Sequence, residues 1–200
     1  MLKIFFFLLF SCGINAQQLE SLKILKIKHD SIETQLKLKY QEEIKGKSDS
    51  EISEIYYQNL LSRSKNNRER LDHYFSAVQT YLETQKLIGP SQEAAQQEIP
   101  DKTANYSQGF PALYKEVHDF IKNQYQDRLD EYFTKSAKIH FIVQNDHSLY
   151  IEKVEGTEKE FNDLALLAFL MTTGKWESAF QRGTNVKSKF VLPVKFVVEE

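Results

Sequence analysis

Apolar and polar residues alternate along the last part of the chain, from Lys187 to Phe196. An alternation with a period of two is typical of a strand that buries one of its faces. The same period occurs in residues 137–144, and a second short apolar run follows at residues 149–154. Between these two runs lie the turn-forming residues Asn145-Asp146-His147-Ser148. The pattern therefore predicts a hairpin, followed later by a long final strand.

Helical spacing takes over on both sides of the predicted hairpin. Phe110-Pro111 begins one amphipathic stretch, and proline suits the first position of a helix because its missing N–H would have no partner there. A second stretch follows the possible capping residue Thr157 and ends at Thr173-Gly174. Trp176, the only tryptophan, comes next and is expected in the core. The order predicts an α+β fold for residues 109–200, with a three-stranded antiparallel sheet packed against two helices.

The first half of the chain has a helical pattern only. Two sets of residues lie seven positions apart, namely Leu22, His29 and Leu36, and Leu25 and Ile32. This spacing indicates a long and weak heptad stripe on one helix. Residues 46–50 break the stripe, and Ser48 and Glu51 have the spacing of a capping box. We therefore expect a second helix to begin at this point.

That second helix is expected from about Asp49 to Leu87, where Gly89-Pro90 ends it. Its expected apolar face carries Ile52, Ile55, Tyr56, Leu60, Leu71, Tyr74, Phe75, Val78, Tyr81 and Leu82. The stretch from Ser62 to Arg70 is polar throughout, and it is either a solvated turn of the helix or a break. A short turn between two amphipathic helices favours a helical hairpin over residues 17–88, with a coiled coil between two chains as the alternative. The polar residues 89–108 are expected to form an interdomain linker.

The first 16 residues have the character of a signal peptide. Lys3 precedes an apolar run that is too short for a membrane-spanning helix, which needs about 20 residues. Ala16 is a small residue placed for cleavage before Gln17. We therefore expect a periplasmic or otherwise exported protein. The alternative is a lipoprotein anchored through Cys12, because Leu9-Phe10-Ser11-Cys12 loosely resembles a lipobox.

Charge and motifs exclude several functional classes. A net charge of -2 over 200 residues gives no basic field for nucleic acid. The sequence has no Gly-rich phosphate loop, nucleophile elbow or Cys–His pair, so we expect neither an enzyme nor a bound cofactor. Of the five histidines only His140 and His147, which flank one turn, are expected to meet, and no metal site is expected. The acids Asp127, Asp130 and Glu131 are interpreted as surface residues. An exported enzyme with an unrecognised site is the alternative.

Residues from about 106 to 200 resemble the C-terminal domain of TonB, in the variety common among exported proteins of Bacteroidetes-type bacteria. The matching pieces are, in order, Phe110-Pro111 before a helix, the strand and turn of residues 138–146, the strand of residues 148–154, a helix ending before Trp176, Gly183, and Leu192-Pro193 in the last strand. Three elements usual in that family are missing: a Tyr-Pro after the first helix, a proline after the tryptophan, and a glycine near the first strand. The match rests on the order of the pieces rather than on any single motif.

The resemblance implies that the last strand lies at a sheet edge and accepts a partner strand. The site residues that it implies are Lys187, Lys189, Phe190, Val191, Pro193 and Lys195. Edge strands often carry lysines and tolerate proline, which agrees with this sequence. With only four prolines there is no proline-rich spacer like that of TonB. We therefore expect a non-enzymatic exported binding protein, related to outer-membrane transport and peripheral or lipid-anchored at most. It would dock a protein partner or dimerise through the last strand, and a TonB-type energy transducer is the alternative.

Overall fold

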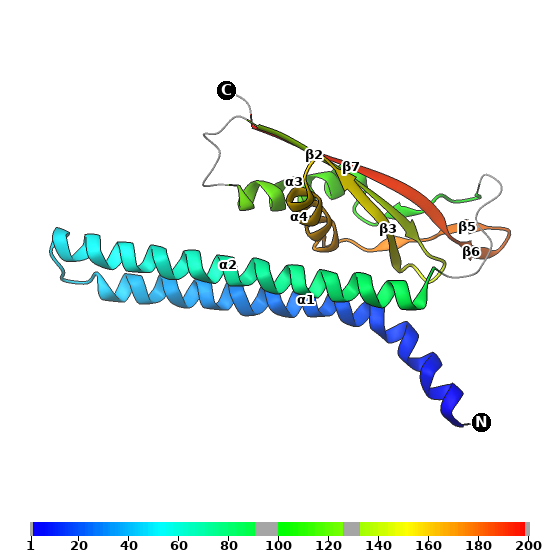
Figure 1. The fold of residues 1–200 in the computed structure, drawn as a ribbon, viewed down its shortest axis with the longest axis horizontal. Coiled ribbons are helices and arrows are strands. Elements are labelled where there is room, and N and C mark those ends of the chain that lie inside the picture. Colours follow the sequence, from blue (N-terminus) through cyan, green and yellow to red (C-terminus); the bar gives the residue numbers. More distant parts are fainter. Residues whose placement is uncertain (1, 91–99, 126–132, 199–200) are drawn as a thin grey trace. The chain divides into compact units, whose positions relative to one another are not determined.

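The computed structural model describes residues 2–90, 100–125 and 133–198, without the side chains of residues 2–19 and Phe133. Two long helices precede a domain of helices and strands, in the order that the sequence predicts (Figure 1). The α+β fold class is confirmed: a helix pair comes first, and a three-stranded antiparallel sheet with its helices follows. The chain divides into two compact units, Gln18–Gln79 and a second unit that includes Thr80–Glu200.

The helix pair consists of α1 (Leu2–Glu43) and α2 (Asp49–Ile88). The connection passes through Gly46, whose φ of 71° lies in the left-handed region that glycine adopts at little cost. At the start of α2 the Glu51 carboxylate accepts hydrogen bonds from the backbone N–H of Ser48 at 3.0 Å and from its hydroxyl at 2.8 Å. The predicted pairing of Ser48 with Glu51 is therefore confirmed.

The buried face of α2 differs from the prediction. Tyr74, Val78 and Tyr81 are buried as expected, but the side chains of Tyr56 and Leu60 are 54% and 46% exposed. The polar stretch from residue 62 to residue 70 is not a break, because α2 continues through it. Asn66, within that stretch, is only 7% exposed. The predicted face is thus wrong at Tyr56 and Leu60, and it missed Asn66, a polar residue that takes an inward position where α1 supplies a polar partner.

The sheet of the second unit contains β2 (Phe133–Val143) between β3 (Leu149–Gly156) and β7 (Ser188–Val198). Both pairings are antiparallel, and a bulge interrupts the pairing of β2 with β3 between His140 and Phe141. Two helices, α3 (Phe110–Gln124) and α4 (Lys159–Leu170), pack on one face of this sheet (Figure 1). The predicted hairpin and the long last strand are both present.

An aromatic cluster fills the space between the sheet and the helices. Trp176 is 7% exposed, and its ring lies within 5.1 to 5.7 Å of the rings of Phe141, Tyr106 and Phe190. Phe169 of α4 packs on Phe141 with ring centroids 4.8 Å apart. The prediction that Trp176 belongs to the core is confirmed.

Short strands extend the fold beside the main sheet. They are β1 (Asn105–Tyr106), β4 (Trp176–Glu177), β5 (Ala179–Gln181) and β6 (Thr184–Val186). β1 pairs with β4, and Lys102 forms a bridge with Phe180. Part of the expected linker over residues 89–108 is therefore paired backbone, because residues 102–106 find strand partners far along the sequence.

The expected signal peptide and Cys12 lie where side chains are not described, so both readings stay predictions. No helix within the described part of the chain combines the length and the hydropathy that crossing a membrane requires.

Candidate functional site

The hydrogen bonds of β2 determine which backbone groups of β7 point away from the sheet. Gln144 donates its backbone N–H to the Ser148 carbonyl at 2.8 Å, and the Thr157 N–H approaches the Ser136 carbonyl at 3.4 Å. The even-numbered residues of β2 therefore direct their backbone groups toward β3. Because these directions alternate along an antiparallel strand, the odd-numbered residues of β2 bond to β7.

The register then assigns the outer side of β7. Phe141 is paired with Phe190 and Lys138 with Pro193, so the even-numbered residues of β7 bond to β2. The odd-numbered ones, Lys189, Val191, Pro193 and Lys195, direct their N–H and C=O groups outward. Proline has no N–H, and its outward position therefore removes no bond from the pairing with β2.

The side chains of the same strand divide in the same way. Leu192, Val194 and Phe196 are buried against the helices, whereas Lys189, Val191, Pro193 and Lys195 are exposed on the opposite face. Four of the six predicted site residues thus share both the outer edge and the open face. Phe190 turns inward, and its ring stacks on Phe141 at 5.5 Å. Lys187 precedes the strand.

The opposite edge of the sheet, at β3, is covered by side chains from the end of α2. The Tyr81 hydroxyl donates to the Leu149 carbonyl at 2.7 Å, and the Gln85 side-chain oxygen accepts the Ile151 N–H at 2.8 Å. Leu149 and Ile151 are paired with odd-numbered residues of β2, so both direct their backbone groups outward. Tyr81 is 3% and Gln85 4% exposed, and burial raises the pKa of Tyr81 well above its ordinary range. The first part of the β3 edge, at Leu149 and Ile151, is therefore closed to another strand.

No other described strand pairs with the outer side of β7, which is the end of the order β3-β2-β7. The asymmetry between the edges was not predicted. Tyr81 was assigned to an apolar helix face, and Gln85 carried no signal. The only feature that could have suggested the covered edge is their spacing of four residues, which places two hydrogen-bonding side chains on one side of a helix.

A row of side chains on α3 lies alongside β7. The ring of Phe110 is 6.1 Å from that of Phe190, and the ring of His118 is 5.4 Å from that of Phe196. Tyr114, one turn after Phe110 and one turn before His118, is 43% exposed. We call Phe110, Tyr114 and His118 the α3 shelf. The shelf adds a partly apolar surface on the helix side of the β7 edge.

The open face beside the edge carries positive charge. Lys189 is paired with Glu152 at 2.7 Å, but neither Lys138 nor Lys195 forms an ion pair within the described residues. Lys138 is paired across the sheet with Pro193, and both lysines border a hollow of about 460 Å³ that also contains Gly156. Glu155 lines the same hollow, and its carboxylate is paired with His140 and Lys153. An acidic group entering this hollow would therefore meet two lysines without ion pairs and one carboxylate that is already paired.

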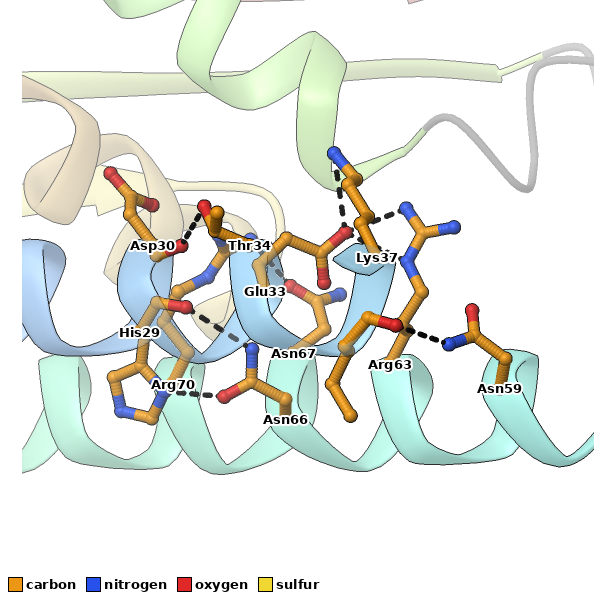
Figure 2. Close-up of polar contacts among 11 residues, drawn as sticks. His29, Asp30, Glu33, Thr34, Lys37, Asn59, Arg63, Asn66, Asn67 and Arg70 are labelled. Atoms are coloured by element: carbon orange, nitrogen blue, oxygen red, sulfur yellow. Dashed lines mark hydrogen bonds and ion pairs between the residues drawn. The ribbon is translucent and has the colours of Figure 1, made fainter. Parts of the chain in front are cut away.

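A cluster of polar groups lies in the helix pair, and it is buried at His29 and Asn66. The Glu33 carboxylate accepts from Arg63 at 2.7 Å, and the Asn59 amide donates to the Leu36 carbonyl at 2.8 Å (Figure 2). His29 is 1% exposed and faces Asn66 across the interface between α1 and α2, which we call the seam. Each contact joins residues whose numbers sum to 95 or 96, so one antiparallel register satisfies all of them.

Both ring nitrogens of His29 lie within hydrogen-bonding distance of side chains on α2. Asn66 donates its amide to the His29 carbonyl at 3.4 Å, which places the Asn66 oxygen 2.8 Å from Nδ1, where the ring N–H donates. The other ring nitrogen of His29, Nε2, lies 3.0 Å from Nδ1 of His73. Tyr74 packs edge-on against His29, and burial raises the pKa of Tyr74 to about 12. The seam is thus a hydrogen-bonded polar core.

The histidine prediction was wrong about which residues meet. His29 and His73 contact each other although they are 44 positions apart in the sequence, whereas His140 bonds to Glu155 and His147 to Ser178. No three potential metal ligands cluster among the residues that the structure describes. The acids Asp127, Asp130 and Glu131 lie outside the described residues.

Comparison with known proteins adds no relative to this description: no family model, no curated protein and no solved structure matches the chain.

Proposed function

We propose that this chain is a non-enzymatic binding protein that docks an extended segment of another protein along the outer edge of β7. The observation that carries the proposal is the difference between the two edges of the sheet. Tyr81 and Gln85 occupy the outward Leu149 carbonyl and Ile151 N–H at the start of β3, whereas the outward groups of Lys189, Val191 and Lys195 have no strand beside them within the described chain. An unpaired row of backbone donors and acceptors is what strand addition requires.

Pro193 limits how a partner strand can pair. Val191 and Lys195 offer both an N–H and a C=O, but Pro193 offers only its C=O. Each main-chain bond is worth about 0.5–1.5 kcal/mol net, so a partner gains most when its ladder does not need a donor at Pro193. The proline therefore favours one register of the docked strand.

The flanks of the edge favour a partner strand of alternating character. Side chains of the partner strand that lie opposite Pro193 and Lys195 would project on the open face, near Lys138 and Lys195. Their neighbours would project on the helix side, over Phe110 and Tyr114. We propose that acidic side chains of the partner strand suit the open face, and that its apolar side chains suit the helix side.

Dimerisation through β7 is the second form of this proposal, and the charges disfavour it. Two copies of β7 would bring Lys189 and Lys195 of one copy close to those of the other, and like charges across a ladder destabilise it. The TonB-like resemblance supports a role at an outer-membrane transport system, and the expected signal peptide supports an exported location. An energy-transducing role has no separate observation in its favour.

The proposal is tested by Val191→Pro, which removes one outward N–H and no bond to β2. Pro193 already occupies an equivalent position, so the strand accepts proline there. Val191→Thr is the matched control, because it keeps the N–H and changes only the side chain. Fluorescence polarisation with a library of labelled eight-residue peptides, alternating apolar and acidic residues, measures binding.

We expect at least one peptide to bind the wild-type chain. Its affinity for Val191→Pro should be at least tenfold lower, and its affinity for Val191→Thr should be almost the same as for the wild type. Amide exchange should slow at Lys189, Val191 and Lys195 when the peptide is added. Equal binding by both variants, or protection at Leu149 and Ile151 instead, would place the site elsewhere. Removing β7 entirely is less informative, because Leu192 and Phe196 belong to the core.

A further inference from the structure

A patch of large apolar side chains is exposed on α2, within the unit Gln18–Gln79. Its members, each about half exposed, are Tyr56, Tyr57, Leu60 and Leu61. Each tyrosine has a leucine four positions later, so the four side chains share one side of the helix. The hydrogen bonds to α1 come from other positions of α2, among them Asn59 and Asn66. Exposed apolar patches of this kind mark interaction surfaces, and we call this one the α2 patch.

The charges of α2 are separated on the two sides of the α2 patch. Residues 49–54 carry three acids and no base, whereas residues 63–70 carry four bases and one acid. The eight residues between them, 55–62, carry no charge at all. This part of α2 therefore runs from negative through apolar to positive.

Two of these charges lie in line with the α2 patch. Glu54, Leu61 and Arg68 are spaced by seven residues, which is two helical turns, so they follow one another along the same side of α2. All three are exposed. Glu54 accepts a hydrogen bond from the Gln58 amide at 2.9 Å, and neither Glu54 nor Arg68 forms an ion pair within the described residues. Both charges are thus available to a partner that covers Leu61.

The arrangement is complementary to itself. A twofold axis at Leu61 exchanges positions that lie equally far before and after it, so it places Glu54 of each copy beside Arg68 of the other. A parallel alignment would instead bring like charges together, and charges at the flanks of an apolar stripe set the orientation of paired helices. A partner with a single sign of charge would suit one end of the segment only.

From these observations we infer that the α2 patch binds a second copy of this chain. The two α2 helices pack antiparallel, with the two Leu61 side chains at the centre and two symmetric Glu54–Arg68 ion pairs at the ends. Residues 50–70 span about 30 Å, and the face is about 10 Å wide. This is smaller than the interfaces of tight dimers, so the dimer should dissociate at roughly micromolar concentrations.

Sedimentation equilibrium of the full chain across the micromolar range tests the inference, with far-UV circular dichroism to confirm that each variant is folded. We expect a monomer–dimer equilibrium for the wild type and a monomer for Leu61→Glu, which places two carboxylates at the centre. Glu54→Arg alone and Arg68→Glu alone should each raise the dissociation constant at least tenfold. Glu83→Arg, which makes the same change of charge at an exposed position of α2 beyond this face, is the matched control and should not.

A mixture of the two single variants gives the sharpest result. Glu54→Arg and Arg68→Glu, combined in equal amounts, restore both ion pairs between unlike copies and should dimerise about as well as the wild type. An effect within one chain cannot be rescued by mixing, so a mixture that stays monomeric overturns the antiparallel pairing.

Two further outcomes overturn the inference. A wild type that is monomeric throughout the range means that another partner covers the α2 patch or that none does. A dimer that Leu61→Glu leaves intact means that the copies meet elsewhere. Val191→Pro should leave the dimer unchanged, because the α2 patch uses no residue of β7, and strand docking therefore stands or fails separately.

Discussion

The backbone N–H of Ile151 donates to the side-chain oxygen of Gln85, 66 residues earlier in the chain, at 2.8 Å. One turn before Gln85 on α2, Tyr81 donates to the Leu149 carbonyl. Two side chains of a helix thus form the hydrogen bonds that the backbone of a neighbouring strand would otherwise form. Covering an edge with a helix is one of the ways in which proteins prevent unwanted strand pairing.

Replacing Gln85 with methionine should open this closed edge. The variant has a similar size but leaves the buried Ile151 N–H without an acceptor, which costs about 1–3 kcal/mol. We expect a lower urea midpoint and, at high protein concentration in analytical ultracentrifugation, self-association beyond that of the wild type. Lys86→Gln, on the exposed side of the same turn, serves as the control. A Gln85→Met variant with the mass and stability of the wild type would show that the contact does not protect the edge.

The polar seam of the helix pair predicts a non-additive pair of substitutions. Asn66→Leu alone leaves Nδ1–H of His29 buried without an acceptor and should destabilise the chain by about 1–3 kcal/mol. His29→Leu combined with Asn66→Leu replaces both partners with apolar groups and should recover much of that loss. Urea unfolding of the wild type, both single variants and the double variant measures the coupling. Additive effects would mean that the two side chains do not depend on each other.

Local signals in the sequence predicted the elements well but predicted few of the contacts between them. The pairing of Ser48 with Glu51 was predictable because the two residues are three positions apart. The inward position of Asn66 was not, because its partner His29 is 37 positions away. Tyr56 and Leu60 follow the same helical spacing as the buried residues, and only the position of α1 decides that they are exposed. The β7 edge was implied by a resemblance, whereas its opposite, the covered β3 edge, depends on tertiary contacts that no local pattern encodes.

The start of α2 should depend on pH through Glu51. Hydrogen bonds from the Ser48 backbone and hydroxyl, together with Lys47, lower the pKa of Glu51 from 4.5 to about 2. A lowered pKa in the folded chain means that the contribution of Glu51 to stability is complete above pH 4.5 and is lost as the pH falls toward 2. Amide exchange at the first turn of α2 should therefore accelerate over this interval. In Glu51→Gln the acceleration should be absent, and a wild type with no change in this interval contradicts the prediction.

Gly174 should tolerate no side chain, because a Cβ at this position would meet the ring and hydroxyl of Tyr106. Tyr106 is fully buried, and its hydroxyl accepts the Gly174 N–H and donates to Glu116. It has no room to retreat, so we expect Gly174→Ala to cost about 1–3 kcal/mol through overpacking. Thermal unfolding followed by the fluorescence of the adjacent Trp176 measures the loss. An unchanged midpoint would mean that the Tyr106 ring shifts freely, and that this close approach does not fix the end of α4.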